Sequence, residues 1–263
     1  MMATCVLVLS GLDPGGGAGL LADARAIGSA GAFACGVVTV LTVQSTNGLR
    51  RTVPVRASLW TEQARVVLRD QRVSAIKVGA LGNAANVRAA SALLASHRDI
   101  PSVVDPVFVP TRGSGRLLAE GAVATLRREL LPRATLVTAN AAEAEALTRA
   151  RVTNVAEARV AALAIVAMGA HAVLVKGGHL ADARATDLLA TRDGLIELSS
   201  VRLRLRRKIH GAGCILSSLI AGRLAIGNDL PTAVRWAKRK HHNVLRRTVD
   251  LGGDLLVLVG PVH

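Results

Sequence analysis

Aromatic residues are scarce in this chain of 263 residues: they make up 2% of it, and tyrosine is absent. Proteins that bind single-stranded nucleic acid normally stack the bases on aromatic side chains. Only Phe33, Phe108, Trp60 and Trp236 are present, which is too few for such a platform. The net charge of +15 favours an anionic partner, but the lack of aromatics argues against nucleic acid as that partner.

Cysteines are also few, and they are far apart. The chain has three, Cys5, Cys35 and Cys214, with no Cys-x-x-Cys pair and no histidine cluster at zinc-ligand spacing. This pattern argues against a disulfide scaffold and a structural zinc site, and it favours a reducing, cytoplasmic setting.

Long apolar runs are missing as well. No uninterrupted stretch approaches the ~20 residues needed to span a bilayer. The short run Cys5–Ser10 has no basic segment before it, so we interpret it as a buried strand and not as a signal peptide. With 51% apolar and 19% charged residues, the chain is expected to fold around a substantial core.

Short apolar runs alternate with amphipathic stretches along the first two thirds of the chain. Runs rich in Val and Leu predict buried strands, and stretches with a 3.6-residue period predict helices. This alternation is typical of a parallel sheet covered on both faces. The predicted strands are Cys5–Ser10, Val37–Val43, Ala75–Val78, Ser102–Val104, Thr135–Thr138 and Ala172–Lys176; the predicted helices are Gly19–Ala30, Asn86–Ser96, Gly121–Leu131, Ala141–Leu147 and Val155–Met168.

After Lys176 the pattern changes to closely spaced strands and then to helices. The pair Asp193-Gly194 predicts a hairpin turn. The chain shows no repeat, low-complexity segment or linker, so residues 1–263 are predicted to form one domain. The strands predicted here are Thr186–Thr191, Leu195–Leu198 and Val201–Leu205, and the helices are Cys214–Ala225 and Pro231–Arg247.

The segment Lys208–Cys214 carries the clearest functional signal. Gly211 and Gly213 permit a tight turn, and the apolar residues after them predict a buried helix. The free N–H groups at the start of that helix would bind a phosphate. Cys214 would lie at the same positive end, where we expect the pKa of its thiol to fall. A glycine turn followed by a buried structural cysteine is the alternative.

Polar or glycine residues follow six of the predicted strands. In open α/β sheets, ligands bind beyond the carboxyl ends of the strands. These residues are therefore expected to meet at one edge of the sheet. They are Ser10–Gly19 with Asp23, Gln44–Asn47, Gly79 with Ala80, Asp105–Val107, Asn140 with Glu143, and Lys176–His179.

In this order and spacing the motifs resemble those of the ribokinase-like superfamily. More narrowly, the chain is similar to the hydroxymethylpyrimidine and phosphomethylpyrimidine kinases of thiamine biosynthesis, from about Val6 to Ala237. The resemblance implies a three-layer sandwich, with a mostly parallel central sheet and helices on both faces. It is carried by the runs Asp13–Asp23, Val104–Val107, Asn140–Glu143, Val175–His179 and His210–Cys214.

The resemblance implies phosphorylation, with ATP and Mg²⁺, of 4-amino-5-hydroxymethyl-2-methylpyrimidine, its monophosphate, or both, in the cytoplasm and by a homodimer. Cys214 stands where most of the superfamily has an aspartate base. The resemblance assigns catalysis to Cys214 with Gly211, Ala212 and Gly213; nucleotide contacts to Lys176, Asn140, Gly177 and His210; Mg²⁺ to Asp105 and Glu143; and pyrimidine contacts to Gly11, Ala18, Asp23, Val43, Gln44, Ala80 and Val107.

Two other functions remain open from the sequence. A vitamin B6 kinase of the same superfamily would accept a pyridine that carries a hydroxymethyl group, because this ring resembles the pyrimidine in shape. Separately, Ala80 stands where the family often has methionine, which would enlarge the pyrimidine pocket. A non-catalytic pyrimidine-binding regulator would use the basic residues near Lys208 and on the last helix. His241 and His242 on that helix are predicted to be solvated and to have no chemical role.

Overall fold

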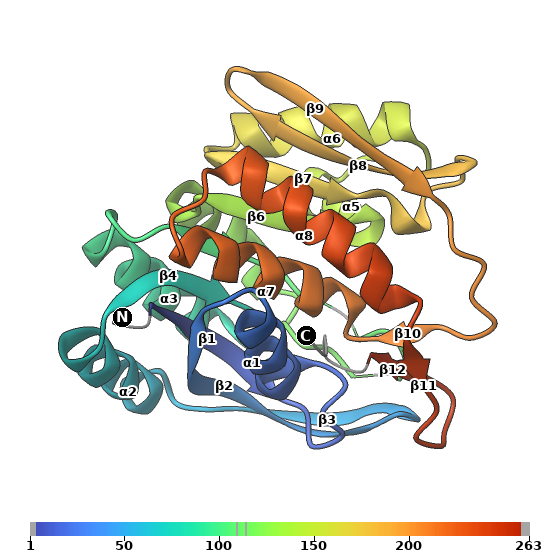
Figure 1. Cartoon of the computed structure of the whole chain (residues 1–263). Helices are drawn as coiled ribbons and strands as arrows, with labels where there is room; N and C mark the ends of the chain where they lie inside the picture. Colours follow the sequence, from blue (N-terminus) through green and yellow to red (C-terminus); the bar gives the residue numbers. More distant parts are fainter. Residues whose placement is uncertain (1–3, 109, 114, 259–263) are drawn as a thin grey trace.

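The computed structural model describes residues 4–108, 110–113 and 115–258. Its main sheet has nine strands in the order β3-β2-β1-β4-β5-β6-β7-β8-β9 (Figure 1). The strands are β1 (Cys5–Leu12), β2 (Phe33–Ser45), β3 (Gly48–Pro54), β4 (Val73–Val78), β5 (Ser102–Val104), β6 (Leu136–Asn140), β7 (Ala172–Lys176), β8 (Arg184–Thr191) and β9 (Gly194–Val201). A small second sheet contains β10 (Ile209–His210), β11 (Thr248–Val249) and β12 (Leu256–Leu258).

The helices are α1 (Gly19–Ser29), α2 (Ala57–Asp70), α3 (Ala84–Ser96), α4 (Ala122–Thr125), α5 (Ala141–Thr148), α6 (Val155–Ala167), α7 (Ala212–Ala225) and α8 (Leu230–Leu245). A π-helical turn, η1 (Leu126–Leu130), and two 3-10 turns, η2 (Leu131–Arg133) and η3 (Gly177–His179), complete the described elements. None of the helices within the described residues combines the length and the apolar character needed to cross a membrane.

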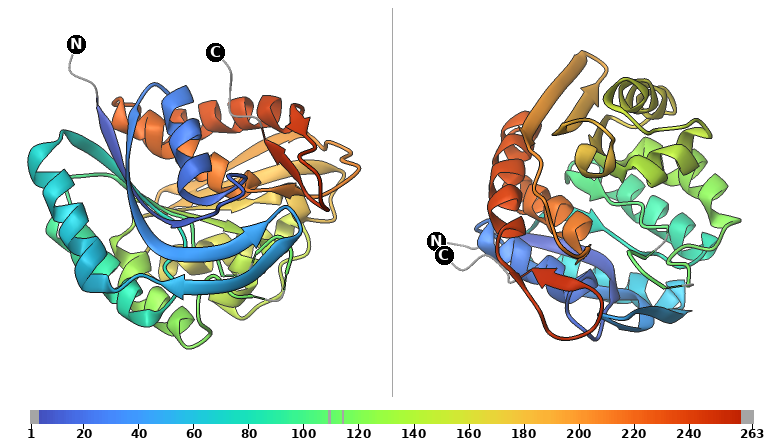
Figure 2. Two further views of the ribbon diagram at one scale, coloured as in Figure 1. Left: turned by 90° about the horizontal axis from the view of Figure 1, so that it is seen from below. Right: turned by 90° about the vertical axis from the view of Figure 1, so that its right-hand side faces the viewer.

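The sheet is parallel from β2 through β7 and antiparallel at both edges. Alternate residues of β1 show why it is covered on both faces: Val6 and Val8 pack with α1, α7 and α8, whereas Leu7 and Leu9 pack with α2 and α3. Figures 1 and 2 show these two helix layers on opposite sides of the sheet. The predicted three-layer α/β architecture is confirmed.

The predicted strand Val201–Leu205 is wrong, because β9 ends at Val201. The chain leaves the sheet there, and the guanidinium of Arg202 donates hydrogen bonds to the carbonyls of Gly177, Gly178, Leu180, Asp182 and Arg184. Arg202 therefore holds the loop after β7 in place instead of continuing the strand. The hairpin between β8 and β9 is present, with its turn at Arg192 and Asp193.

Candidate functional site

Two glycine-containing loops are in close contact at the first turn of α7. Gly211, which precedes the helix, has a φ of 77°, a left-handed conformation that favours glycine. A Cβ atom there would also collide with the carbonyl oxygen of Gly17. The loop Asp13–Gly19 therefore lies against the helix start, whose free N–H groups and positive dipole end suit an anion.

Lys176, the last residue of β7, brings a positive charge to this helix start. A Cβ atom on Gly213 would lie 3.2 Å from Lys176 Nζ. Nζ also donates to Asp105 Oδ1 at 2.9 Å, and it lies 3.6 Å from Glu143 Oε2. Burial alone would lower the pKa of Lys176, but Asp105 and Glu143 raise it, so the ammonium stays charged. The predicted nucleotide contact thus lies between the two predicted metal carboxylates.

Asn140 and Glu143 form a capping box at the start of α5. Asn140 Oδ1 accepts from the backbone N–H of Glu143 at 2.9 Å, and Glu143 Oε2 accepts from that of Asn140 at 2.7 Å. Burial raises the pKa of Glu143 to about 7, with Lys176 opposing and Asp105 adding to this shift. Asp105 takes the shorter bond to Lys176, so Glu143 is the carboxyl that protonates more readily.

The thiol of Cys214 does not behave as expected. Burial raises its pKa to about 12; Lys77 opposes the shift, Asp105 and Asp23 add to it, and a hydrogen bond from the backbone N–H of Gly19 opposes it. The prediction of a lowered pKa is therefore wrong. Desolvation of the thiolate and two nearby carboxylates outweigh the positive end of α7. At neutral pH the group is a thiol.

A second cluster joins Asp13, Gln44 and His210. Nε2 of His210 lies 2.8 Å from Asp13 Oδ2 and 3.1 Å from the Gln44 side-chain nitrogen. Asp13 also accepts from the backbone N–H groups of Gly15 and Ala18, both at 2.9 Å. Burial opposes the charge on Asp13, but the hydrogen bond from His210 and these amides hold its pKa below the usual value. The cluster connects the end of β2, the glycine loop and the start of α7.

Asp23 lies in a fully buried ion pair. Its Oδ2 accepts from Lys77 Nζ at 2.9 Å, its Oδ1 accepts from Ser218 Oγ at 2.8 Å, and both charged side chains are 0% exposed. Ser218 lies one helical turn after Cys214, so the pair supports α7 below the predicted anion site. Asp23 therefore has no exposed surface to offer a ligand, and its assignment as a pyrimidine contact stays a prediction.

The remaining predicted pyrimidine contacts lie at the ends of neighbouring strands. A Cβ atom on Gly11 would lie 3.5 Å from that of Ala80, so these two residues face each other. Val43 on β2 is exposed, and Val107 follows β5 with its N–H donating to the Asp105 carbonyl at 2.8 Å. Gly177 is buried, and its N–H donates to Asp187 Oδ1.

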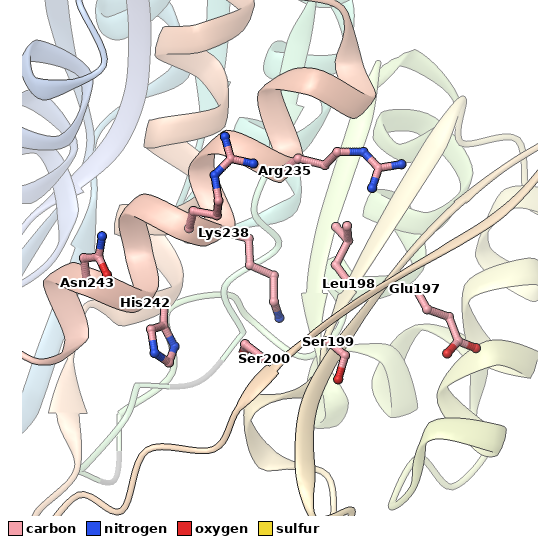
Figure 3. A pocket seen from close by; sticks show the side chains of 9 residues that line it. Glu197, Leu198, Ser199, Ser200, Arg235, Lys238, His242 and Asn243 are labelled. Atoms are coloured by element: carbon pink, nitrogen blue, oxygen red, sulfur yellow. The ribbon is translucent and has the colours of Figure 1, made fainter.

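A groove of about 530 Å³ lies between β9 and α8. Figure 3 shows Arg235, Lys238 and His242 on the helix side, facing Ser199 and Ser200 on the strand side. Lys238 Nζ pairs with Asp187 Oδ2 at 2.7 Å, and Asp187 also holds the backbone after Lys176. The groove therefore continues from the Lys176 end of the site and carries a basic lining.

His241 is the clearest residue that sequence reasoning misplaced. It is half-buried, and its Nε2 donates to the carbonyl of Ala212 at 2.9 Å, at the start of α7. Burial lowers its pKa to about 4, with Asp187 and the Ala212 carbonyl opposing the shift and Lys238 and Lys176 adding to it. Its prediction as a solvated residue is wrong, because the return of α8 past α7 cannot be read from local charge.

Replacing His241 by glutamine is expected to make the protein less sensitive to acid. The wild-type ring protonates near pH 4 when folded but near 6.5 in the unfolded chain. Its contribution to stability is therefore present above pH 6.5 and is lost as the pH falls toward 4. Glutamine can still donate to Ala212 but does not titrate. Urea unfolding at about pH 7.5 and at about pH 5 measures how much stability each protein loses between the two values. The exposed His171→Gln variant is the control. Equal losses of stability in the wild type and in His241→Gln would contradict the prediction.

Lys77 was missed as a functional candidate, and Asp13 was named only as part of its glycine-rich run, with no role of its own. Lys77 is the single charged residue in the apolar run Val73–Leu81, and a lysine inside a buried strand indicates a buried acidic partner. Asp13 opens a glycine-rich run, where a carboxylate commonly accepts from loop amides. Both signals were visible in the sequence, whereas the identity of their partners was not.

The chain is similar to known kinases over almost its whole length. A family model described as phosphomethylpyrimidine kinase matches residues 13–262. The hydroxymethylpyrimidine/phosphomethylpyrimidine kinase of Rhizobium meliloti is 40% identical over 100% of this chain and 97% of its own length. The Escherichia coli protein of the same description is 34% identical, over 98% of this chain and 96% of its own length.

Solved structures give the same fold. The ADP complex of Bacillus subtilis pyridoxal kinase superposes with a TM-score of 0.90 at 25% identity, covering 99% of this chain and 98% of that one. The phosphomethylpyrimidine kinase of Clostridium difficile gives a TM-score of 0.77 at 27% identity, covering 92% of this chain and 99% of that one.

Proposed function

Because this chain belongs to the phosphomethylpyrimidine kinase family, we propose that it transfers a phosphoryl group from ATP to 4-amino-5-hydroxymethyl-2-methylpyrimidine, to its monophosphate, or to both. One observation carries the proposal: the start of α7, Lys176 and Cys214 lie together, next to the polar cluster of Asp13, Gln44 and His210. The side of the site at the start of α7 suits a phosphate group, and the side at the polar cluster suits a polar ring.

The phosphoryl group would lie at the first turn of α7. The N–H groups of Ala212, Gly213 and Cys214 have no earlier helical carbonyl to bond, so they are free to donate to phosphate oxygens. Lys176 is close enough to add its charge. Phosphoryl transfer depends mostly on positioning and on neutralising charge, and these groups supply both.

The hydroxyl of the substrate would meet Cys214. Since the pKa of this thiol is raised to about 12, Cys214 is not ionised before the reaction. In a loose transition state the attacking hydroxyl loses its proton late, so a strong base is not required. We therefore assign Cys214 only the orientation of the hydroxyl, and the proton of that hydroxyl would pass to an oxygen of the transferred phosphoryl group as the bond to phosphorus forms.

Asp105 and Glu143 fit a magnesium ion held largely through water. Within the described residues no group of three or more metal-ligating side chains gathers, so the protein would supply few direct ligands, as Mg²⁺ tolerates. Asp105 Oδ2 and Glu143 Oε1 are not the atoms that contact Lys176. A bound Mg²⁺ would neutralise phosphate charge.

For the pyrimidine, Gln44 offers an amide at the polar end, and Gly11, Ala18, Ala80, Val43 and Val107 offer small or apolar surface around it. Asp23 would act indirectly through the packing of α7. The homodimer expected from the resemblance stays a prediction.

The groove between β9 and α8 suits the remainder of the nucleotide, because it adjoins the Lys176 end and is basic. Arg235→Glu is expected to raise the KM for ATP about 3- to 10-fold through charge reversal at the groove, with the KM for the pyrimidine nearly unchanged. Arg88→Glu, an equal charge change on α3 at the opposite face of the sheet, is the control. An equal rise in the KM for ATP in both variants would show that the groove does not bind the nucleotide.

Vitamin B6 kinase is the second candidate function. Its support is the likeness to a solved pyridoxal kinase, with a TM-score of 0.90 over 99% of this chain. An ADP-release assay with the pyrimidine alcohol, its monophosphate and pyridoxine separates the two functions. Faster turnover of pyridoxine than of either pyrimidine would replace the proposal, and pyrimidine binding without ADP release would favour a binding protein.

A further inference from the structure

The neighbours of His210 constrain the orientation of Gln44. His210 is 4% exposed, and its Nε2 has two polar neighbours, Asp13 Oδ2 at 2.8 Å and the Gln44 side-chain amide at 3.1 Å. Its other nitrogen, Nδ1, is buried and has no hydrogen-bond partner among the described residues. The protonation of this one ring therefore decides what the Gln44 amide can do.

Asp13 requires a hydrogen on Nε2. The Asp13 carboxylate accepts from the backbone N–H groups of Gly15 on Oδ1 and of Ala18 on Oδ2. Burial opposes its charge, but its hydrogen bonds hold its pKa below the usual value, so Asp13 is ionised at neutral pH. A bare Nε2 at 2.8 Å from an ionised oxygen would place two lone pairs together. The ring therefore carries hydrogen on Nε2, and the orphaned Nδ1 is left as a lone pair, without a buried N–H to satisfy.

This tautomer excludes a hydrogen bond from the Gln44 nitrogen, because Nε2–H has no lone pair to accept it. The two ends of an amide are nearly identical in shape, and their hydrogen bonds determine which end is which. The bonded orientation is the one in which Gln44 Oε1 shares the Nε2 hydrogen with Asp13. Its NH₂ group then faces away from His210.

We propose that Asp13 and His210 are positioning residues that hold the Gln44 NH₂ group toward the bound substrate, so that the site selects a ring with an unprotonated ring nitrogen facing Gln44. The inference rests on the proposed function in one respect, that Gln44 contacts the ring. In this arrangement Gln44 acts as a donor, and an exocyclic amine must be recognised by a carbonyl or carboxylate elsewhere.

The tautomer can be measured without any substrate. Long-range ¹H–¹⁵N spectra of the full chain are expected to show His210 with a protonated Nε2 and a bare Nδ1, assigned by the loss of these signals in His210→Gln. A bare Nε2 with a protonated Nδ1 would overturn the proposal, because Gln44 could then donate to the ring and present its oxygen. This result does not depend on kinase activity.

The second measurement is the binding of three ligands by calorimetry: the pyrimidine alcohol and the two aminopyridine analogues in which one ring nitrogen is replaced by C–H. The analogue that lacks the ring nitrogen facing Gln44 is expected to bind the wild type about 10- to 100-fold more weakly than the pyrimidine alcohol does, because the Gln44 NH₂ group is then a buried donor without an acceptor. In His210→Leu this gap should shrink to less than about threefold, whereas His210→Gln, which can still donate to Asp13, should keep most of it.

Ser45→Ala, next to Gln44 but outside the cluster, is the matched control and should keep the wild-type gap. A gap that is unchanged in His210→Leu, or absent from the wild type, would overturn the positioning role. Failure of all three ligands to bind any variant would count against the proposed function, while the spectra would still decide the tautomer.

Discussion

Replacing Cys214 by alanine is expected to lower turnover about 100-fold or more, because the substrate hydroxyl loses the group that orients it for attack on phosphorus. The KM for ATP should change little, because the backbone N–H groups of the α7 start and Lys176 remain in place. Since the pKa of the thiol is raised to about 12, the wild-type rate should show no inflection from Cys214 between pH 7 and 9. Steady-state kinetics over this range measure both quantities.

Cys214→Ser is the companion variant, because a hydroxyl of similar size can still orient the substrate hydroxyl. It should retain more activity than the alanine variant. If the alanine variant turns over at the wild-type rate, Cys214 is a packing residue. A wild-type inflection near pH 8.5 that disappears in the alanine variant would instead show that the thiol ionises far more easily than its buried surroundings allow.

The central architecture could be predicted from the sequence because its strands are locally consistent. Ser102–Val104 and Ala172–Lys176 were predicted with the bounds that the structure shows. Each is a short apolar run between polar segments. A strand that is buried on both faces is apolar along its whole length, so the run itself marks where the strand begins and ends. The strand end at Lys176 was also the correct place to expect polar residues to gather.

The edges of the sheet were less predictable. Strand β3 lies at the edge of the sheet beside β2 and contains Arg50 and Arg51, so it has no apolar signature. Helix α2 was missed, although Trp60, Ala64, Val67 and Leu68 follow a helical period on its inner face. The predicted strand Val201–Leu205 failed because its alternating arginines look like a half-buried strand, whereas Arg202 instead binds the loop carbonyls after β7.

Partnerships between distant residues lay beyond the sequence. Gln44 was singled out as a substrate contact, but nothing local shows that it meets His210, which is 166 residues away. The pKa of Cys214 was expected from one helix terminus alone. Burial and the carboxylates of Asp105 and Asp23 reverse the sign of the shift. A side chain's pKa and its hydrogen-bond partners depend on all of its neighbours, and only the tertiary structure brings these neighbours together.

Lys77→Met is expected to lower the free energy of unfolding by about 3–5 kcal/mol, the usual loss when one partner of a buried ion pair is removed. Burial opposes the charge on Lys77, but the Asp23 and Asp105 carboxylates raise its pKa, so the lysine is charged. Its removal would leave the Asp23 carboxylate fully buried with only Ser218 as a side-chain donor. Urea unfolding at neutral pH measures the loss.

The double variant Lys77→Met/Asp23→Leu distinguishes a stranded charge from lost packing. Replacing both charged groups by apolar side chains removes the uncompensated carboxylate, so most of the lost stability should return. Some loss should remain, because Ser218 Oγ loses its acceptor. If the double variant is no more stable than Lys77→Met, the lysine acts through its packing in β4. A single variant within about 1 kcal/mol of the wild type would mean that water reaches Asp23 and that the pair is not the support of α7.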